Sequence, residues 1–285
     1  MTKIGRTGVS CVTALAALMI ATASQAQSLG FGRGNSDPIH IEANDGIEWQ
    51  RTEQVYIARG DARASQGGVT VEADELIAHY RSTESGSDEI YKIDANGNVR
   101  IVSESEVATG DKAEYDVIKG VLIMTGKQVR LVTPLDTITA RDSLEYYEDK
   151  QLAIARGDAL AIREDRRVRA DTLMAHFLAK DGKKRSSKME RIEAIGNVHL
   201  STATDIVTAE RGDYQLNAGL ATVSGGVRIT RGETQLNGDR AEVNLNTGQS
   251  RLLTKSAGAR NPSERVRGIF LPSARPESGD SGKTQ

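Results

Sequence analysis

A pair of short motifs recurs along the chain at a nearly constant interval. The first is a glycine followed two residues later by valine, alanine or glutamine, and it occurs at Gly60, Gly97, Gly126, Gly157, Gly196 and Gly225. The second is a small residue followed by a charged one, 14 residues after five of these glycines and 15 after Gly126. Its charged members are Asp74, Asp111, Arg141, Asp171, Glu210 and Asp239. Such recurrence indicates one small structural unit stacked several times.

The sequence also repeats over a longer interval, which contains several of the short repeats. Residues 43–80 match residues 140–177 at a constant offset of 97, so that Ala58-Arg59-Gly60-Asp61-Ala62 pairs with Ala155-Arg156-Gly157-Asp158-Ala159. Further on the offset becomes 99, where Gly97-Asn98-Val99 meets Gly196-Asn197-Val198. We therefore predict two β modules, residues 37–133 and 134–255.

The two ends differ in composition from the repeats. Residues 1–26 have the features of a cleaved secretory signal: Lys3 and Arg6, about 15 apolar or small residues, short of the ~20 that span a membrane, and a small-x-small site at Ser24-Gln25-Ala26. Residues 27–36 suggest a flexible leader. The tail, residues 256–285, is predicted to be mostly disordered, with only Val266 to Leu271 able to dock.

The cysteine content and the net charge limit which classes of function are possible. The single cysteine, Cys11, lies inside the predicted signal, so the exported chain would be held by its core and backbone hydrogen bonds without disulfides. Removal of the signal would change the net charge from −2 to −4, and no basic stripe indicates nucleic-acid binding. Arginines are dense at residues 163–169, either as solvated surface charges or as contacts for an anionic group.

Period-two alternation predicts an almost wholly β structure. Ile39-His40-Ile41-Glu42-Ala43 and Val69-Thr70-Val71-Glu72-Ala73 alternate apolar and polar residues, as do the segments that follow each glycine. At ordinary strand lengths this predicts about 14–18 strands, with the glycines between strands at turns or bulges. Two architectures fit: a long antiparallel jelly roll, which the unit length favours, and a parallel β-solenoid.

Catalytic and cofactor signals are weak. Histidines 79 and 176 occupy equivalent positions in the two modules, which suits a structural role better than a single active site. The carboxylates also recur with the repeat, and no metal-ligand or nucleotide-binding spacing is present. We expect no catalytic residues, no metal and no cofactor, and hence a protein that is not an enzyme.

Several stretches resemble the LptA/OstA-like family of periplasmic lipopolysaccharide-transport proteins. They are the opening Ile39-His40-Ile41-Glu42-Ala43, the stretches Asn96-Gly97-Asn98-Val99 and Ile195-Gly196-Asn197-Val198, and the ending Arg265 to Pro272. The resemblance spans residues 37–272, and the ordered recurrence of its short motifs is what makes it specific. The loops at 82–88 and 181–188 are longer and more charged than is typical of the family.

The resemblance implies an elongated, twisted jelly roll of tandem modules, open at both ends, that binds the acyl chains of lipid A. It implies a periplasmic bridge between the membranes, with the inner-membrane complex contacted through LptC, the outer membrane through LptD, and head-to-tail self-association. Alternation and family likeness together give a predicted lipid-binding lining: Ile39, Ile41, Trp49, Val69, Val71, Tyr80, Val99, Ile101, Val129, Leu131, Tyr146, Val168, Phe177, Val198 and Leu200.

Two alternatives stay open from the sequence. A β-solenoid enzyme that acts on polysaccharides would need a cluster of carboxylates on one face. A structural repeat protein of the cell envelope would need no ligand. The recurrent aromatic residues can likewise be core packing or part of the lining.

Overall fold

The computed structural model describes residues 38–83, 88–178, 188–244, 246–254 and 266–269. Within these ranges the protein is all β, and no helix there is long and apolar enough to cross a membrane. The strands are β1 (His40–Glu42), β2 (Gly46–Gln50), β3 (Val55–Gln66), β4 (Val69–Ser82), β5 (Asp88–Val102), β6 (Val107–Asp116), β7 (Val121–Thr125), β8 (Val129–Val132), β9 (Thr137–Ala140), β10 (Ser143–Tyr147), β11 (Leu152–Arg163), β12 (Arg166–Phe177), β13 (Met189–Ser201), β14 (Asp205–Gln215), β15 (Leu220–Arg231), β16 (Thr234–Asn244), β17 (Gln249–Leu253) and β18 (Arg267–Ile269).

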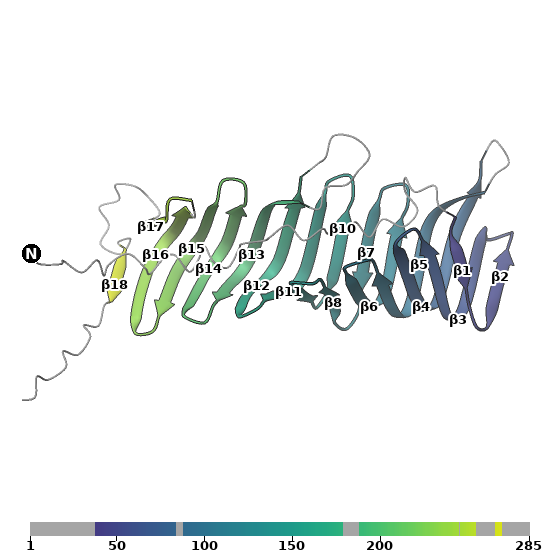
Figure 1. Ribbon diagram of the computed structural model, residues 1–285, viewed down its shortest axis with the longest axis horizontal. Coiled ribbons are helices and arrows are strands. Elements are labelled where there is room, and N and C mark those ends of the chain that lie inside the picture. The colour runs from purple at the N-terminus through teal and green to yellow at the C-terminus, as the bar shows by residue number, and fades with distance from the viewer. Residues whose placement is uncertain (1–37, 84–87, 179–187, 245, 255–265, 270–285) are drawn as a thin grey trace, which may run out of the picture.

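All 18 strands belong to one antiparallel sheet that is folded lengthwise into two layers (Figure 1). The long strands cross from one layer to the other at a bend near their middle, where the pairing register shifts. Layer I contains β1, β8, β9, β18 and the halves of the long strands that pair with them. Layer II contains β2, β7, β10, β17 and the other halves.

The repeated glycines form the bend. Gly97 has φ +76° and is followed by Asn98 at φ +48°, a pair of left-handed conformations that turns the strand and inserts a bulge. The same pair of left-handed residues occurs at Gly60, Gly157, Gly196 and Gly225. The prediction that the glycines lie at turns or bulges is confirmed, but these five lie inside continuous strands, and only Gly126 of the six lies between strands, β7 and β8.

The core lies on the inner side of the bend and draws side chains from both layers. Val99, Val129 and Val198 of layer I are 1% exposed or less, and they belong to one cluster with Leu76 and Met124 of layer II. Many other members are alanines, which allow the two layers to approach closely next to the bend. The fold is therefore the twisted antiparallel jelly roll, and the solenoid is excluded because neighbouring strands are antiparallel.

Both modules begin with the same interrupted strand. Between β1 and β2 the backbone N–H of Asp45 donates to the carbonyl of Arg59 (2.9 Å), and between β9 and β10 the N–H of Asp142 donates to that of Arg156 (3.0 Å). The modules share one uninterrupted sheet through the pairing of β8 with β9.

The ends of the sheet lie at opposite ends of the elongated molecule, with β1 and β2 at one and β17 and β18 at the other (Figure 1). Strand β18 falls within the tail segment predicted to dock and pairs with β16. The predicted signal and leader, and most of the loop at 181–188 and of the tail, lie outside the described residues.

Candidate functional site

An apolar row of side chains runs along the inner face of each layer without interruption. In layer I, cross-strand pairing connects fourteen positions from β1 to β18. They are Ile41, Ala64, Val71, Ile101, Ala108, Leu131, Ile138, Ala161, Val168, Leu200, Val207, Ile229, Leu236 and Gly268. Neighbours in such a row are about 4.8 Å apart, so together they form one continuous apolar surface.

Layer II contributes a second row that is richer in aromatic rings. It begins at Trp49 on the edge strand β2, and pairing connects it to Val243 on β16. Its members are Trp49, Tyr56, Ala78, Ile93, Tyr115, Leu122, Tyr146, Ala153, Ala175, Ile192, Tyr214, Ala221 and Val243.

The predicted lining residues lie at different depths between the two layers. Eight are buried: Val69, Val71, Tyr80, Val99, Ile101, Val129, Val198 and Leu200. Six are half-buried: Ile39, Ile41, Leu131, Tyr146, Val168 and Phe177. Trp49 is 47% exposed at the edge of the sheet. Burial varies along a row: Ile101 and Leu200 are 3% exposed, whereas Leu131 and Val168 of the same row retain accessible apolar surface.

Sequence reasoning missed several residues of the same rows. Ile93, Ile138, Ile192 and Leu236 are half-buried and pack against the core. Ile93 between Lys92 and Asp94, and Ile138 between two threonines, follow the alternation that identified the others. The alanines of the rows carry a weaker signal, because alanine is small enough to occur on exposed as well as on buried faces.

Aromatic rings cluster where the layer II row begins. Trp49 stacks on Tyr56 at 5.7 Å between ring centroids, and Tyr56 packs against Tyr80 at 4.9 Å. The indole N–H of Trp49 donates to the hydroxyl of Tyr80 (2.8 Å), and the Arg51 guanidinium lies 4.1 Å from the Trp49 ring centroid. These contacts fix an exposed indole at the end of the molecule.

Turns at the free side of layer I place acidic side chains beside the apolar row. In the turns 103–106, 133–136 and 202–205, the first backbone N–H donates to the carbonyl of the fourth residue at 2.9 Å. Asp136 receives two hydrogen bonds from Arg163 (2.6 and 2.5 Å), and Asp205 receives two from Arg231 (2.6 and 2.9 Å). The third acid is Glu106. Because Val107 pairs with Val132, the residue opposite Glu106 on the neighbouring strand is Thr133. In the other two turns this position is an arginine.

Glu106 is consequently a buried acid with a perturbed pKa. Its side chain is buried, and desolvation raises the pKa to about 7. The folded state therefore holds a proton that the unfolded chain, with a pKa of 4.5, releases, so stability is lost as pH rises from about 4.5 to about 7.

Glu106→Gln should stabilise the protein above about pH 7 and leave it unchanged below about pH 4.5. Because burial cannot penalise a neutral amide in this way, the expected gain is about 1–3 kcal/mol in the free energy of unfolding. Urea unfolding at both pH values measures it. Glu104→Gln, an exposed neighbour in the same turn, should give no pH-dependent gain. Equal effects of the two variants would show that burial does not raise the pKa of Glu106.

The outer side of the bend carries a ladder of carboxylates, each over a glycine of the next strand. A Cβ atom added to Gly97 or Gly196 would overlap the carboxylate of Asp74 or Asp171, and one added to Gly157 would overlap that of Asp142. Asn98 and Asn197 donate to the same carboxylates of Asp74 and Asp171 at 2.9–3.1 Å.

The structure corrects the residue that the sequence suggested for the third copy of the charged motif. Asp142, not Arg141, stands over the glycine of the neighbouring strand. Arg141 instead donates to Asp142. The third unit is longer at its bend, since Gly126-Lys127-Gln128 separates β7 from β8.

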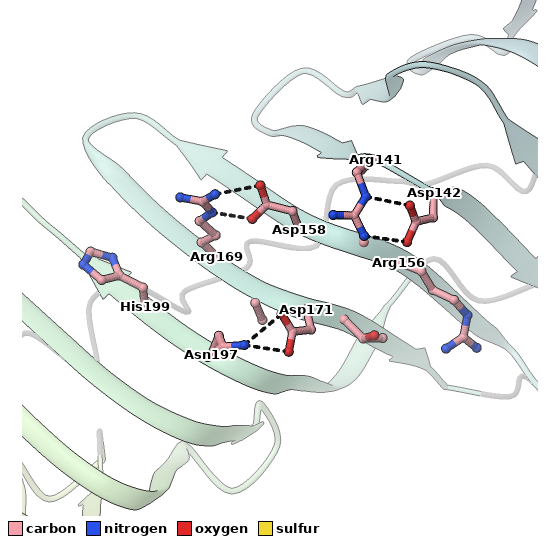
Figure 2. Close-up of a pocket in the computed structure, with 11 residues that line it drawn as sticks. Arg141, Asp142, Arg156, Asp158, Arg169, Asp171, Asn197 and His199 are labelled. Carbon is pink, nitrogen blue, oxygen red and sulfur yellow. Dashed lines mark hydrogen bonds and ion pairs between the residues drawn. The ribbon is translucent and has the colours of Figure 1, made fainter.

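A hollow of about 790 Å³ lies over the bend of the second module (Figure 2). Its charges are mutually satisfied: Figure 2 shows Arg141 bound to Asp142, Arg169 to Asp158 and Asn197 to Asp171. Arg156 donates to Glu145 (2.7 Å). The hollow therefore presents paired ions rather than an activated acid, base or nucleophile.

The remaining titratable groups do not form a catalytic arrangement in the part of the chain that the structure describes. His79 lies 2.8 Å from Asp94 and His176 lies 2.8 Å from Glu193, both on the outer face of layer II at equivalent places in the two modules. Within the described residues, no group of three or more His, Cys, Asp or Glu side chains is placed to hold a metal ion.

Comparison with known proteins places the chain in a family. The family model described as "LptA/(LptD N-terminal domain) LPS transport protein" matches residues 40–142 and 206–280, more than half of the chain. The structure of LptH, the LptA-homologous periplasmic component of the lipopolysaccharide transport device of Pseudomonas aeruginosa, aligns with a TM-score of 0.37 and 12% identity. That alignment covers 48% of this chain and 95% of that one. No curated protein gives a significant match. The chain belongs to the LptA and LptD N-terminal family of lipopolysaccharide transport proteins.

Proposed function

We propose that the protein carries lipopolysaccharide across the periplasm by holding its acyl chains against the two inner apolar rows. The observation that supports this most is the continuity of these rows along the whole sheet. An acyl chain of about a dozen methylenes gains about 10 kcal/mol on leaving water, at about 0.8 kcal/mol per methylene. A continuous row offers this gain at every point, so a lipid can advance without returning to water.

The half-buried members of the rows are the proposed contacts. Leu131, Ile138 and Val168 in layer I, with Tyr146 and Ile192 in layer II, pack on the core and keep part of their surface accessible. Residues beside the bend, such as Val99 and Val129, support the lining from beneath because their surface is already filled. The periplasmic location is part of the proposal and is supported by the signal-like residues 1–26.

Photo-crosslinking tests this lining. A photo-reactive amino acid at Leu131 should capture lipopolysaccharide in cells, because its side chain lies on the inner face. The same group at Thr70, an outward-facing residue next to Val71 and away from the β8–β9 junction, should capture little or none. Equal labelling at the two positions would contradict the assignment, and no labelling at either would favour a structural repeat protein without a ligand.

The open ends of the sheet support the bridging part of the proposal. Among the described residues, β2 pairs only with β3, and Ile47 on it is 53% exposed, although the residues that continue its row, Ala58 and Leu76, are buried. A further strand placed on β2 would bury Ile47 and satisfy the edge. We propose head-to-tail association of copies, with LptC and LptD as the partners at the two ends of the bridge.

Ile47→Asp should weaken this self-association about tenfold or more, because a carboxylate would be buried between the stacked sheets. Sedimentation velocity over a range of concentrations measures the change. Ile118→Asp is the matched control, since Ile118 is 48% exposed in a turn away from the sheet ends. Unchanged association in the Ile47 variant would place the contact elsewhere.

A further inference from the structure

The two modules differ in charge at one hairpin. The β11–β12 hairpin of the second module corresponds to the β3–β4 hairpin of the first at the offset of 97. Four arginines in the second hairpin replace uncharged or acidic residues of the first: Arg163, Arg166, Arg167 and Arg169 stand where the first module has Gln66, Val69, Thr70 and Glu72. The same backbone thus carries a basic surface in one copy only.

Two of these arginines extend a basic surface over the outer face of layer I. Pairing connects Arg130, Arg169, Arg228 and Arg267 into one outward row, with Arg167 in the adjacent row. From β8 to β18, neither row contains an acidic residue among the described positions, and the acid that binds Arg169, Asp158, lies at the bend. All five arginines are exposed.

The same row in the first module is electrically balanced. There the order is Glu42, Arg63, Glu72 and Arg100, in which each arginine lies beside a glutamate. Arg100 donates to Glu72 at 3.0 Å. The excess of positive charge therefore begins at Arg130 on β8, the last strand of the first module, and continues along the second module.

The outer face of layer II is balanced in both modules. Arg59 binds Glu48 and Glu75, Arg191 binds Asp213, and Arg240 binds Glu242. The protein as a whole has a net charge of −2. The basic face of layer I is thus a local feature and not the result of a basic composition.

The basic face adjoins the inner apolar row directly. Val168 of the inner row lies between Arg167 and Arg169, which point to the opposite side of the same strand. The turn of the hairpin, Glu164-Asp165, separates the two faces at this point. The flanking Arg163 is bound to Asp136 and Arg166 lies 3.9 Å from Asp165, so the accessible guanidinium groups near the turn are those of the outward rows. A molecule with its acyl chain on Val168 and an anionic head group at the turn can reach both faces.

We propose that the outer face of layer I from β8 onward, centred on Arg130, Arg167, Arg169 and Arg228, binds the phosphate and carboxylate groups of the saccharide part of lipopolysaccharide. The proposal rests on the proposed function, because acyl chains held on the inner row bring the charged sugars to the β11–β12 turn. Guanidinium groups suit this role, since they form two parallel hydrogen bonds to phosphate or carboxylate.

A charge-matched pair of double variants tests the proposal. Arg167→Thr with Arg169→Glu installs the residues of the first module, Thr70 and Glu72, and lowers the net charge by three. Arg251→Thr with Arg240→Glu lowers it equally on the outer face of layer II, where both arginines are exposed. The ligand is the fully deacylated saccharide of lipopolysaccharide with its phosphates and acidic sugars retained, and calorimetry at low salt measures binding.

The first double variant should bind the deacylated saccharide about tenfold more weakly than the parent, and the second should bind it like the parent. Equal affinity of the parent and the first variant would overturn the proposal. So would a loss confined to phosphatidylglycerol vesicles, which would make the face a membrane-docking surface. The cross-linker at Leu131, introduced into the first variant, should still capture lipopolysaccharide. Its failure in the parent would instead count against the proposed function.

Discussion

Gly97→Ala should lower the free energy of unfolding by about 2–4 kcal/mol, one of the two largest effects expected of a single substitution here. Two causes act together. The backbone at Gly97 has φ +76°, which costs about 1–2 kcal/mol for a residue with a Cβ atom. The added Cβ would also overlap the carboxylate of Asp74 on the neighbouring strand. Urea unfolding followed by circular dichroism measures the change.

A glycine at another bend provides the control for the steric overlap. Gly226 has φ +59° with open space where a Cβ atom would lie, and it occupies the second bulge position, which is Asn98 in the equivalent bend. Gly226→Asn should therefore leave stability nearly unchanged. Adding Asp74→Ala to Gly97→Ala should recover part of the loss, because the overlap disappears while the strain remains. If both glycine variants lose the same stability, backbone strain alone determines the cost and the carboxylate ladder is irrelevant.

Ile138→Asp should reduce the affinity for lipopolysaccharide by about a hundredfold. Ile138 is half-buried in the inner row of layer I, next to Leu131 and Ala161 on the neighbouring strands. A carboxylate there would be desolvated by a bound acyl chain and would interrupt the apolar row at the junction of the two modules. Equilibrium binding of fluorescent lipopolysaccharide measures the loss.

Thr70→Asp is the control, since the same carboxylate then points outward from layer I in the first module, away from the basic row that begins at Arg130. Circular dichroism should report the β fold in both variants, because Ile138 is not among the fully buried residues. Retained affinity in the Ile138 variant would mean that lipid does not contact the inner row at the middle of the molecule.

The repeat in the sequence predicted the architecture because its two motifs are the two sides of one bend. The hairpin register sets Gly60 opposite Asp74, so the length of the β3–β4 hairpin fixes their spacing, whereas the carboxylate that lies over each glycine comes from the preceding unit. The prediction failed in the third copy, where the interruption between β9 and β10 moves the acid from position 141 to Asp142. Turns and bulges use the same left-handed backbone, so the sequence alone did not show that the glycines lie within strands.

Alternation identified inner residues but not their depth. Val99 and Leu131 have the same pattern in the sequence, yet Val99 is 1% exposed beside the bend while Leu131 is half-buried farther from it. That difference depends on the separation of the two layers, which no local pattern encodes. The imbalance of charge on layer I was equally hidden, because it requires the cross-strand register that brings Arg130, Arg169 and Arg228 into one row.

The number of strands in the sheet also determines the length of the molecule. In the described part of the chain each layer contains fourteen strands side by side, and with about 4.8 Å per strand one copy spans roughly 60–65 Å. Most strands pair with neighbours in sequence, and the interrupted strand that opens each module is the same. The 97-residue offset between the two copies corresponds to six strands in each layer. Each duplication of such a unit would therefore lengthen the molecule by about 30 Å, so that its length follows from the number of repeats in the sequence.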